Sequence, residues 1–353
     1  RVPHAGRTRR PRPGTVPPGP DCRGDRGACA SQSAEFPPDA ERLKGAGVRT
    51  PWREFATVSG RMGRGVLVKF EGAQHTGSFK FRGAYNRLSR LDVTQRQAGV
   101  VAWSSGNHAQ GVAAAAKRLG IRATIVMPAD APANKLANTR RLGAEVVTYD
   151  RFNESREAIA AGIAEARGAV RVPPFDDPYI MAGQGTVGLE ILEQAAEAGA
   201  DIAAVLVCCG GGGLTAGVAT AVKGRRPDIA VYCVEPETFD DTARSLVAGT
   251  RQKVSPEARS ICDALMSPSP GELTFPINQA LLSGGLTVSE DEVKDAMRFA
   301  FQSMKLVIEP GGAVALAALL NSRLPVGDSP VAIVVSGANA DAELYAAILR
   351  GEV

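Results

Sequence analysis

One lysine, set between two phenylalanines, has the clearest chemical potential in this chain. It lies in the run Gln74-His75-Thr76-Gly77-Ser78-Phe79-Lys80-Phe81-Arg82-Gly83-Ala84. The aromatic neighbours predict partial burial, which disfavours the ammonium form and lowers the pKa of a lysine. A lysine whose amine is neutral can form an imine with a carbonyl compound. Lysines beside aromatic residues are also common in ordinary helices, so this segment alone does not distinguish an imine-forming lysine from an ordinary one.

A run of four glycines provides the second signal. Gly210, Gly211, Gly212 and Gly213 precede Leu214 and separate a predicted strand from a predicted helix. Backbone N–H groups in such a loop can converge on an anion at the helix N-terminus. The loop has neither the Lys-Ser/Thr of a P-loop nor the spacing of a dinucleotide fingerprint. Since four glycines are unfavourable in conformational entropy, we favour a phosphate site over a flexible turn.

A polar turn follows the predicted strand 100–103. It consists of Ser104, Ser105, Gly106, Asn107 and His108. Two hydroxyls, an amide and the N–H groups of a helix start could bind a carboxylate. The turn could equally be an N-cap, and a helical histidine beside a turn is more often structural than a base.

Two more predicted strands end in residues that could hold a ligand. Ser336 follows strand 331–335, at the sheet edge where α/β folds place ligands, although a Ser-Gly turn is also ordinary there. Residues 235–241 follow strand 229–234 and contain four acids, the first of them Glu235 and the last Asp241. Phe239 lies in the same segment. Such a segment could collect a divalent cation through oxygen ligands, but an acidic loop is the commoner outcome.

The pyridoxal phosphate (PLP) cofactor has the two groups that these signals match, an aldehyde and a phosphate. An imine-forming lysine and a phosphate-binding loop are what a PLP enzyme requires. Both lie in a chain of 353 residues with 44% hydrophobic content, which is ample for a large core.

Charge and cysteine content exclude several other classes. The net charge is +4, but residues 1–30 hold seven Arg and two Asp, so the remainder is slightly acidic. We therefore expect no nucleic-acid partner, and no apolar run approaches the length of a membrane span. The six cysteines fit neither a zinc site nor a disulfide framework, so we expect reduced, buried thiols and a cytoplasmic location. Residues 1–35 are rich in Arg, Pro and Gly, which predicts a disordered tail.

Alternating strands and helices must position these groups. We predict strands at residues 65–70, 100–103, 123–127, 145–149, 202–207, 229–234 and 331–335. We predict helices at residues 78–91, 107–119, 134–142, 154–166, 180–198, 215–223, 291–304, 313–321 and 342–349. This order predicts an α/β fold with two open, mostly parallel twisted sheets flanked by helices. We expect residues 36–98 and 180–353 to form a large cofactor-binding domain and residues 99–179 a small domain.

Taken in order, these segments resemble the PLP-dependent fold type II family, in its threonine dehydratase and serine racemase branch. The resemblance covers about residues 45–350, and the form of residues 77–84 is that of the dehydratases. It implies that Lys80 carries the cofactor as a Schiff base and later removes the Cα proton. Phe79 would pack on the cofactor ring. The glycine loop and the Leu214 amide would bind the phosphate.

The resemblance also assigns the remaining site residues. Ser336 would hydrogen-bond the pyridine nitrogen, and Asn107 would contact the ring hydroxyl. Glu309 lies in a family segment near the cofactor. The turn of residues 104–108 would bind the substrate carboxylate. Glu235, Asp241 and the carbonyl of Phe239 match a divalent-cation loop that could hold Mg²⁺, Mn²⁺ or Ca²⁺.

The implied reaction is β-elimination from a small hydroxy amino acid. L-Threonine would give 2-oxobutanoate, L-serine would give pyruvate, and both would release ammonia. Ser105 stands where many threonine dehydratases carry Ala, and a serine there can act as a second acid and base. A serine racemase or a 3-hydroxyaspartate ammonia-lyase is therefore the alternative. Ala264 stands where the family usually has Gly, which could tighten the substrate pocket. We expect a homodimer or homotetramer without a regulatory domain after Ser336.

Overall fold

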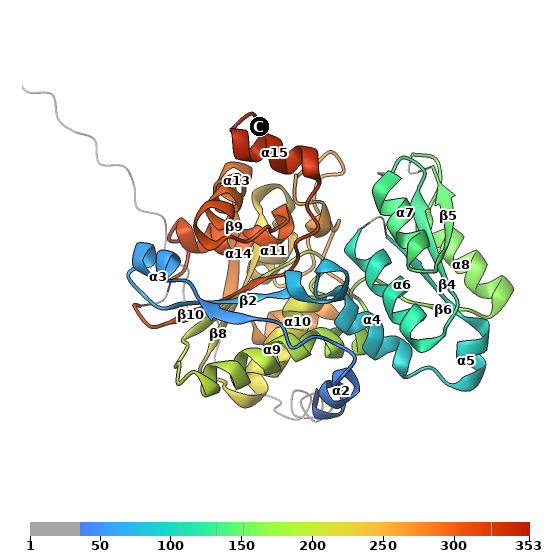
Figure 1. The fold of residues 1–353 in the computed structure, drawn as a ribbon, viewed down its shortest axis with the longest axis horizontal. Helices are drawn as coiled ribbons and strands as arrows, with labels where there is room; N and C mark the ends of the chain where they lie inside the picture. Colours follow the sequence, from blue (N-terminus) through green and yellow to red (C-terminus); the bar gives the residue numbers. More distant parts are fainter. Residues whose placement is uncertain (1–35, 105, 132, 151, 326) are drawn as a thin grey trace, which may run out of the picture.

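The computed structural model describes residues 36–353 except residues 105, 132, 151 and 326. The predicted disordered tail, Ser105, and the thiols of Cys22 and Cys29 lie outside the described residues. The described chain forms two lobes, each built around its own sheet (Figure 1).

The larger sheet has six strands in the order β1-β2-β10-β7-β8-β9. Its strands are β1 (Trp52–Glu54), β2 (Val66–Phe70), β7 (Ala204–Cys208), β8 (Ala230–Pro236), β9 (Gly284–Val288) and β10 (Val331–Val335). Every neighbouring pair is parallel except β1 with β2. The central strand β7 is buried along its whole length, as expected for residues covered on both faces.

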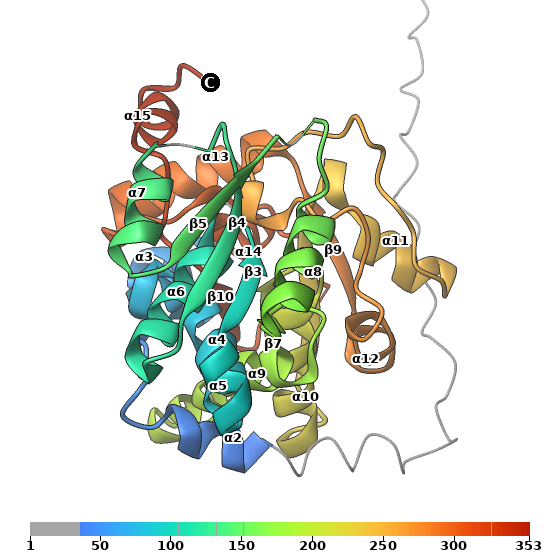
Figure 2. The same cartoon turned by 90° about the vertical axis from the view of Figure 1, so that its right-hand side faces the viewer.

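The smaller sheet has four strands in the order β5-β4-β3-β6, all parallel. These are β3 (Val100–Trp103), β4 (Ala123–Pro128), β5 (Glu145–Tyr149) and β6 (Val170–Arg171). Successive residues of β3 point to opposite faces, so Val100 and Val101 belong to different apolar clusters. Figure 2 shows helices α6 and α8 on the two sides of this sheet.

Helices cover both faces of the two sheets. In chain order the α-helices are α2 (Phe36–Leu43), α3 (Ala56–Met62), α4 (Lys80–Ser89), α5 (Val93–Ala98), α6 (Asn107–Leu119), α7 (Ala133–Arg141), α8 (Arg156–Arg167), α9 (Pro178–Glu197), α10 (Gly213–Arg225), α11 (Asp241–Ala248), α12 (Thr274–Leu281), α13 (Glu290–Phe299), α14 (Pro310–Leu320) and α15 (Ala342–Arg350). Short helical turns are η1 (Glu71–Ala73), η2 (His75–Gly77), η3 (Glu237–Phe239), η4 (Asp263–Leu265) and the π-helical η5 (Ala300–Met304). None of the helices in the described part of the chain has the length and hydropathy needed to span a bilayer.

The predicted fold class is confirmed, because two mostly parallel sheets are flanked by helices. Several short elements carried no clear sequence pattern and were not predicted: β1, β6, β9, α2, α3, α5, α11 and α12. Strand β8 also extends two residues beyond the predicted end. Glu235 therefore lies on a strand instead of in an acidic loop.

Glycines bring three helices unusually close together. A Cβ atom built on Gly183 of α9 would lie 2.6 Å from the Cα of Gly83 in α4. On the other side of α9, a Cβ on Gly217 of α10 would lie 2.3 Å from the carbonyl oxygen of Met181. Only hydrogen fits at these contacts, so the backbones of α4, α9 and α10 pack directly against one another.

Candidate active site

Lys80 is the first residue of α4, which lies between the two lobes (Figure 1). Its Nζ donates a hydrogen bond to the carbonyl oxygen of Pro174 at 2.8 Å and lies 5.0 Å from the centroid of the Phe79 ring. Burial lowers the pKa of Lys80 to about 8, and the neighbouring Cys208 and Glu309 side chains only partly oppose this. The amine therefore loses its proton far more readily near neutral pH than an ordinary lysine does, as an imine-forming lysine requires.

The turn before Lys80 is attached to the end of β10. The N–H of Phe79 donates to the carbonyl oxygen of Ser336 at 3.1 Å, and Ser78 forms an isolated β-bridge with Gly337. Gly111 of α6 supports the lysine from the other lobe, because a Cβ there would lie 3.0 Å from the Lys80 carbonyl carbon. Both lobes thus contact the backbone that presents the amine.

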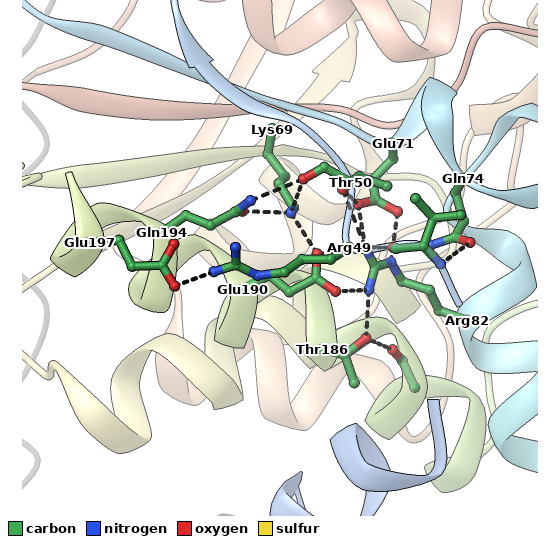
Figure 3. Close-up of polar contacts among 12 residues, drawn as sticks. Arg49, Thr50, Lys69, Glu71, Gln74, Arg82, Thr186, Glu190, Gln194 and Glu197 are labelled. Carbon is green, nitrogen blue, oxygen red and sulfur yellow. Dashed lines mark hydrogen bonds and ion pairs between the residues drawn. The ribbon is translucent and has the colours of Figure 1, made fainter. Parts of the chain in front are cut away.

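A buried network of charges anchors the same helix (Figure 3). The guanidinium of Arg82 donates to both carboxylate oxygens of Glu71, at 2.7 and 2.8 Å. It also donates to Glu190 of α9 at 2.6 and 2.9 Å, and Lys69 donates to Glu190 at 2.6 Å. Thr50 and Gln194 complete the network around the ammonium group of Lys69. Two cations balance two carboxylates, so the register of α4 is held without a net buried charge.

The glycine loop joins β7 to α10, as the sequence predicted. Gly212 has φ of +92°, a conformation that favours glycine, and α10 begins at Gly213. The first N–H groups of an α-helix have no partner within the helix, so they are available to an anion. The ring of Phe175 packs on the loop, since a Cβ on Gly211 would lie 2.3 Å from it. The loop therefore needs glycine for packing as well as for backbone direction.

A chain of amides and a buried carboxyl group lies beside the lysine. Asn107 donates to Glu309 at 2.7 Å and accepts a hydrogen bond from Asn339 at 2.8 Å. Burial raises the pKa of Glu309 to about 7, the charge of Asp263 adds to this rise, and the Asn107 hydrogen bond opposes it. The orientation of the Asn107 amide is thereby fixed. Asn339 was not singled out from the sequence, although it lies three residues after Ser336.

His108 has a structural contact instead of a free ring. Its Nε2 lies 2.9 Å from the carbonyl oxygen of Val172, and the side chain is buried. Burial lowers the pKa of His108 to about 3, with the nearby Lys80 acting in the same direction. The ring is therefore neutral at physiological pH, and its Nε2 donates to the Val172 carbonyl in a structural contact.

The predicted carboxylate-binding turn follows β3 and opens α6. The hydroxyl of Ser104 accepts a hydrogen bond from the N–H of Gly106 at 3.1 Å, and Gly106 precedes the first residue of α6. The structure thus gives Ser104 a turn-stabilising contact. Ser105, which was predicted as a second acid and base, lies outside the described residues.

Ser336 follows β10 and is buried. Cys208 lies at the end of the neighbouring strand β7, and the Ser336 side chain acts to lower the pKa of its thiol. Burial raises the pKa of Cys208 to about 12, so this thiol stays protonated. The four described cysteines are all free and buried, as expected for reduced thiols.

The predicted cation ligands lie together but form an incomplete set. Glu235 and Asp241 are buried, and burial raises the pKa of both carboxyl groups, that of Asp241 to about 7. Glu235 accepts hydrogen bonds from the N–H groups of Thr242 and Ala243 at the start of α11. Both carboxylate oxygens of Asp241 are buried without a hydrogen-bond partner. Among the described residues no group of three or more His, Cys, Asp or Glu side chains could hold a metal, so carbonyl oxygens such as that of Phe239 would be needed.

Near the carboxyl ends of β3, β7 and β10, the structure thus brings together a lysine with a lowered pKa, a glycine loop with available N–H groups and a set of fixed polar side chains. A family model described as "Pyridoxal-phosphate dependent enzyme" matches residues 43–337, and the chain belongs to that family. The resemblance seen in the sequence is confirmed, and the family implies PLP as the cofactor. The buried Lys80 amine and the N–H groups of the glycine loop fit its aldehyde and its phosphate.

Relatives place the chain among PLP enzymes that carry out β-elimination. An L-threo-3-hydroxyaspartate ammonia-lyase from Pseudomonas sp is 46% identical over 312 residues, which cover 88% of this chain and 96% of that protein. A serine racemase from Schizosaccharomyces pombe is 40% identical and covers 88% of this chain and 94% of its own length. The crystal structure of a threonine deaminase from T.th. matches with a TM-score of 0.82 at 44% identity, covering 87% of this chain and 98% of that one.

Proposed function

We propose that the chain is an ammonia-lyase that eliminates water from L-threonine and L-serine and then releases ammonia by hydrolysis, which takes up one water. The products are 2-oxobutanoate or pyruvate, together with ammonia. The observation that supports this proposal most strongly is the buried amine of Lys80, with a pKa of about 8. An amine of this kind accepts a proton from Cα and can return it, because both of its protonation states are accessible near neutral pH.

Each surrounding residue has a proposed task. Bound PLP supplies an electron sink for the electron pair that remains when the Cα proton leaves. The N–H groups of the glycine loop hold the phosphate, and Phe79 packs on the ring. Ser336 meets the ring nitrogen with a neutral hydroxyl, which favours elimination over transamination because it does not stabilise a protonated ring. Asn107, held by Glu309, contacts the ring hydroxyl.

The substrate and cation sites are proposed from their chemistry. Ser104, Gly106 and the start of α6 bind the substrate carboxylate, because N–H groups at a helix N-terminus attract an anion. Glu235, Asp241 and the carbonyl of Phe239 would hold a divalent cation. Such an ion would give the buried Asp241 carboxylate the partner that the described residues do not provide.

L-threo-3-hydroxyaspartate is the second candidate substrate. One observation favours it in addition to the Pseudomonas relative. Lys135 of α7 reaches across the lobes to Asp263 at 3.1 Å, and its charge lowers the pKa of Glu309. A cation so close to the site could pair with the second carboxylate of hydroxyaspartate, a group that threonine and serine lack.

The test is 2-oxo acid release from L-threonine, L-serine, D-serine and L-threo-3-hydroxyaspartate in parallel. Threonine and serine should be the best substrates, and Lys80→Ala should abolish turnover of all four. Lys135→Met separates the candidates, because it should reduce only the reaction of the dicarboxylic substrate. If hydroxyaspartate leads and Lys135→Met removes that lead, the second candidate replaces the first. Chiral analysis of the amino acid left from L-serine detects racemisation, which would favour a racemase.

A further inference from the structure

Two buried side chains of α12 hold carbonyl groups of the glycine loop. The hydroxyl of Thr274 donates to the carbonyl oxygen of Gly211 at 2.7 Å. The side-chain amide of Asn278 donates to the carbonyl oxygen of Gly212 at 3.3 Å. Both residues are completely buried. Neither attracted attention in the sequence, where they lie more than sixty residues after the glycines.

These contacts fix the direction of the loop N–H groups. In a planar trans peptide, the N–H of one residue points opposite to the C=O of the residue before it. Holding the Gly211 carbonyl toward Thr274 therefore turns the N–H of Gly212 away from α12. Holding the Gly212 carbonyl toward Asn278 does the same for the N–H of Gly213, the first residue of α10. Each carbonyl also accepts one backbone hydrogen bond, that of Gly211 from the N–H of Gly271 at 3.2 Å and that of Gly212 from the N–H of Ala216 at 2.8 Å. The Thr274 contact is the shorter of the two side-chain contacts, at 2.7 Å against 3.3 Å.

The helix that carries Thr274 is itself tied to the segment that contacts Lys80. The carboxylate of Asp176 accepts hydrogen bonds from the N–H groups of Glu272, Leu273 and Thr274, at 2.9, 2.9 and 3.2 Å. Two residues earlier, the carbonyl of Pro174 accepts the hydrogen bond from the Lys80 amine. The segment between β6 and α9 thus contacts both places where the cofactor would be attached.

We propose that Thr274, with Asn278 in support, is a positioning residue that aims the N–H groups of Gly212 and Gly213 at the cofactor phosphate. It acts only through the glycine loop and touches neither substrate nor cofactor. Because this role presumes that the loop binds the phosphate, as proposed above, it predicts an effect confined to ligands that carry a phosphate. A role in packing alone would weaken all ligands of the site alike.

The experiment compares the binding of PLP and of pyridoxal, which has the aldehyde but no phosphate. Cofactor is removed, and each ligand is titrated back while the visible absorbance is followed. Thr274→Val removes the hydroxyl at nearly constant volume, whereas Thr274→Ser retains it. Thr220→Val is the matched control, because the buried hydroxyl of Thr220 donates to the carbonyl of Ala216, outside the glycine loop.

Thr274→Val should weaken PLP about fivefold, which corresponds to ~1 kcal/mol for one hydrogen bond, and leave pyridoxal within about twofold. Thr274→Ser should restore PLP affinity, and Thr220→Val should change neither ligand. Equal weakening of both ligands, or no change in PLP affinity, overturns the proposal. If Thr274→Val does not fold, Asn278→Ala is judged by the same ratio of the two affinities. A wild-type protein that binds pyridoxal as tightly as PLP refutes the phosphate site itself, which is a different failure.

Discussion

Replacing Glu190 by glutamine should destabilise the protein strongly, because this carboxylate links the two buried cations behind the Lys80 helix. It accepts two hydrogen bonds from Arg82 and one from Lys69, all between 2.6 and 2.9 Å. The side chain of Lys69 is completely buried, and that of Glu190 is 16% exposed. Glutamine has nearly the same volume, so the substitution removes charge without making a cavity.

The expected loss in the free energy of unfolding depends on the partners that Arg82 and Lys69 keep in the variant. Removing one partner of a buried ion pair is destabilising by about 3–5 kcal/mol, since the other charge is left uncompensated. Arg82 keeps Glu71, and Lys69 keeps the carbonyl of Thr50 and the side-chain oxygen of Gln194. We therefore expect the lower end of this range, about 3 kcal/mol in the free energy of unfolding.

The pH dependence provides an independent check. Burial alone would raise the pKa of Glu190, but Arg82 and Lys69 outweigh burial and lower it below the ordinary value of 4.5. A carboxyl group with a lowered folded-state pKa stabilises the protein above its unfolded pKa, and the stabilisation is lost as the pH falls through the folded pKa. The wild type should therefore lose stability below about pH 4.5. The variant should show less of this loss.

Urea unfolding at several pH values measures both effects. The matched control is Glu197→Gln on the same helix, because Glu197 pairs with Arg49 in an exposed ion pair at 2.7 Å. Exposed pairs contribute about 0–1 kcal/mol, so the control should be nearly neutral. Two outcomes would refute the view that charge holds the buried network together. One is an equal loss of unfolding free energy in the two variants, and the other is a loss of stability at acid pH in Glu190→Gln that is as large as in the wild type.

Three further outcomes are expected. Gly183→Ala should lower the free energy of unfolding by about 2 kcal/mol, because its methyl group would lie 2.6 Å from the Cα of Gly83. Gly162→Ala, at an open position of α8, is the control and should be neutral or slightly stabilising in the same urea titration. Asp241→Asn should abolish any rise in melting temperature on addition of Mg²⁺, and an unchanged rise would exclude Asp241 as a ligand. His108 should stay neutral down to about pH 4 when its ring is followed by NMR, and a titration near pH 6.5 would contradict its burial.

The elements predicted from local pattern agree best with the structure. Residues 100–103, 145–149 and 331–335 are strands with the predicted bounds, and residues 107–119 form the predicted helix. Each has a continuous apolar run or an amphipathic repeat that is complete within the segment. β9 was not predicted because two of its five residues are glycine and its first four are only partly buried. The predicted helix 291–304 changes to a π-helix over its last five residues, which apolar spacing does not reveal.

Contacts between distant residues account for what the sequence did not reveal about the site. Lys80 was recognisable from its neighbours, but its partner Pro174 is 94 positions away. Asn107 and Asn339 are separated by 232 positions. Such pairs depend on how the two lobes pack, and a single sequence carries no local mark of them. The residue types at strand ends were predictable, whereas the groups that orient them were not.

The glycine contacts of α9 have a consequence for the spacing of the site. Lys80 opens α4, the glycine loop opens α10, and α9 lies between these helices with its backbone against both. At Gly183 and Gly217 no side chain separates the backbones, so none can adjust its rotamer to absorb a change in distance. At these contacts the distance from α4 to α10 is thus set by the backbone of α9. In the proposed mode of cofactor binding, α9 would therefore keep the Lys80 amine and the N–H groups of the glycine loop at a constant distance.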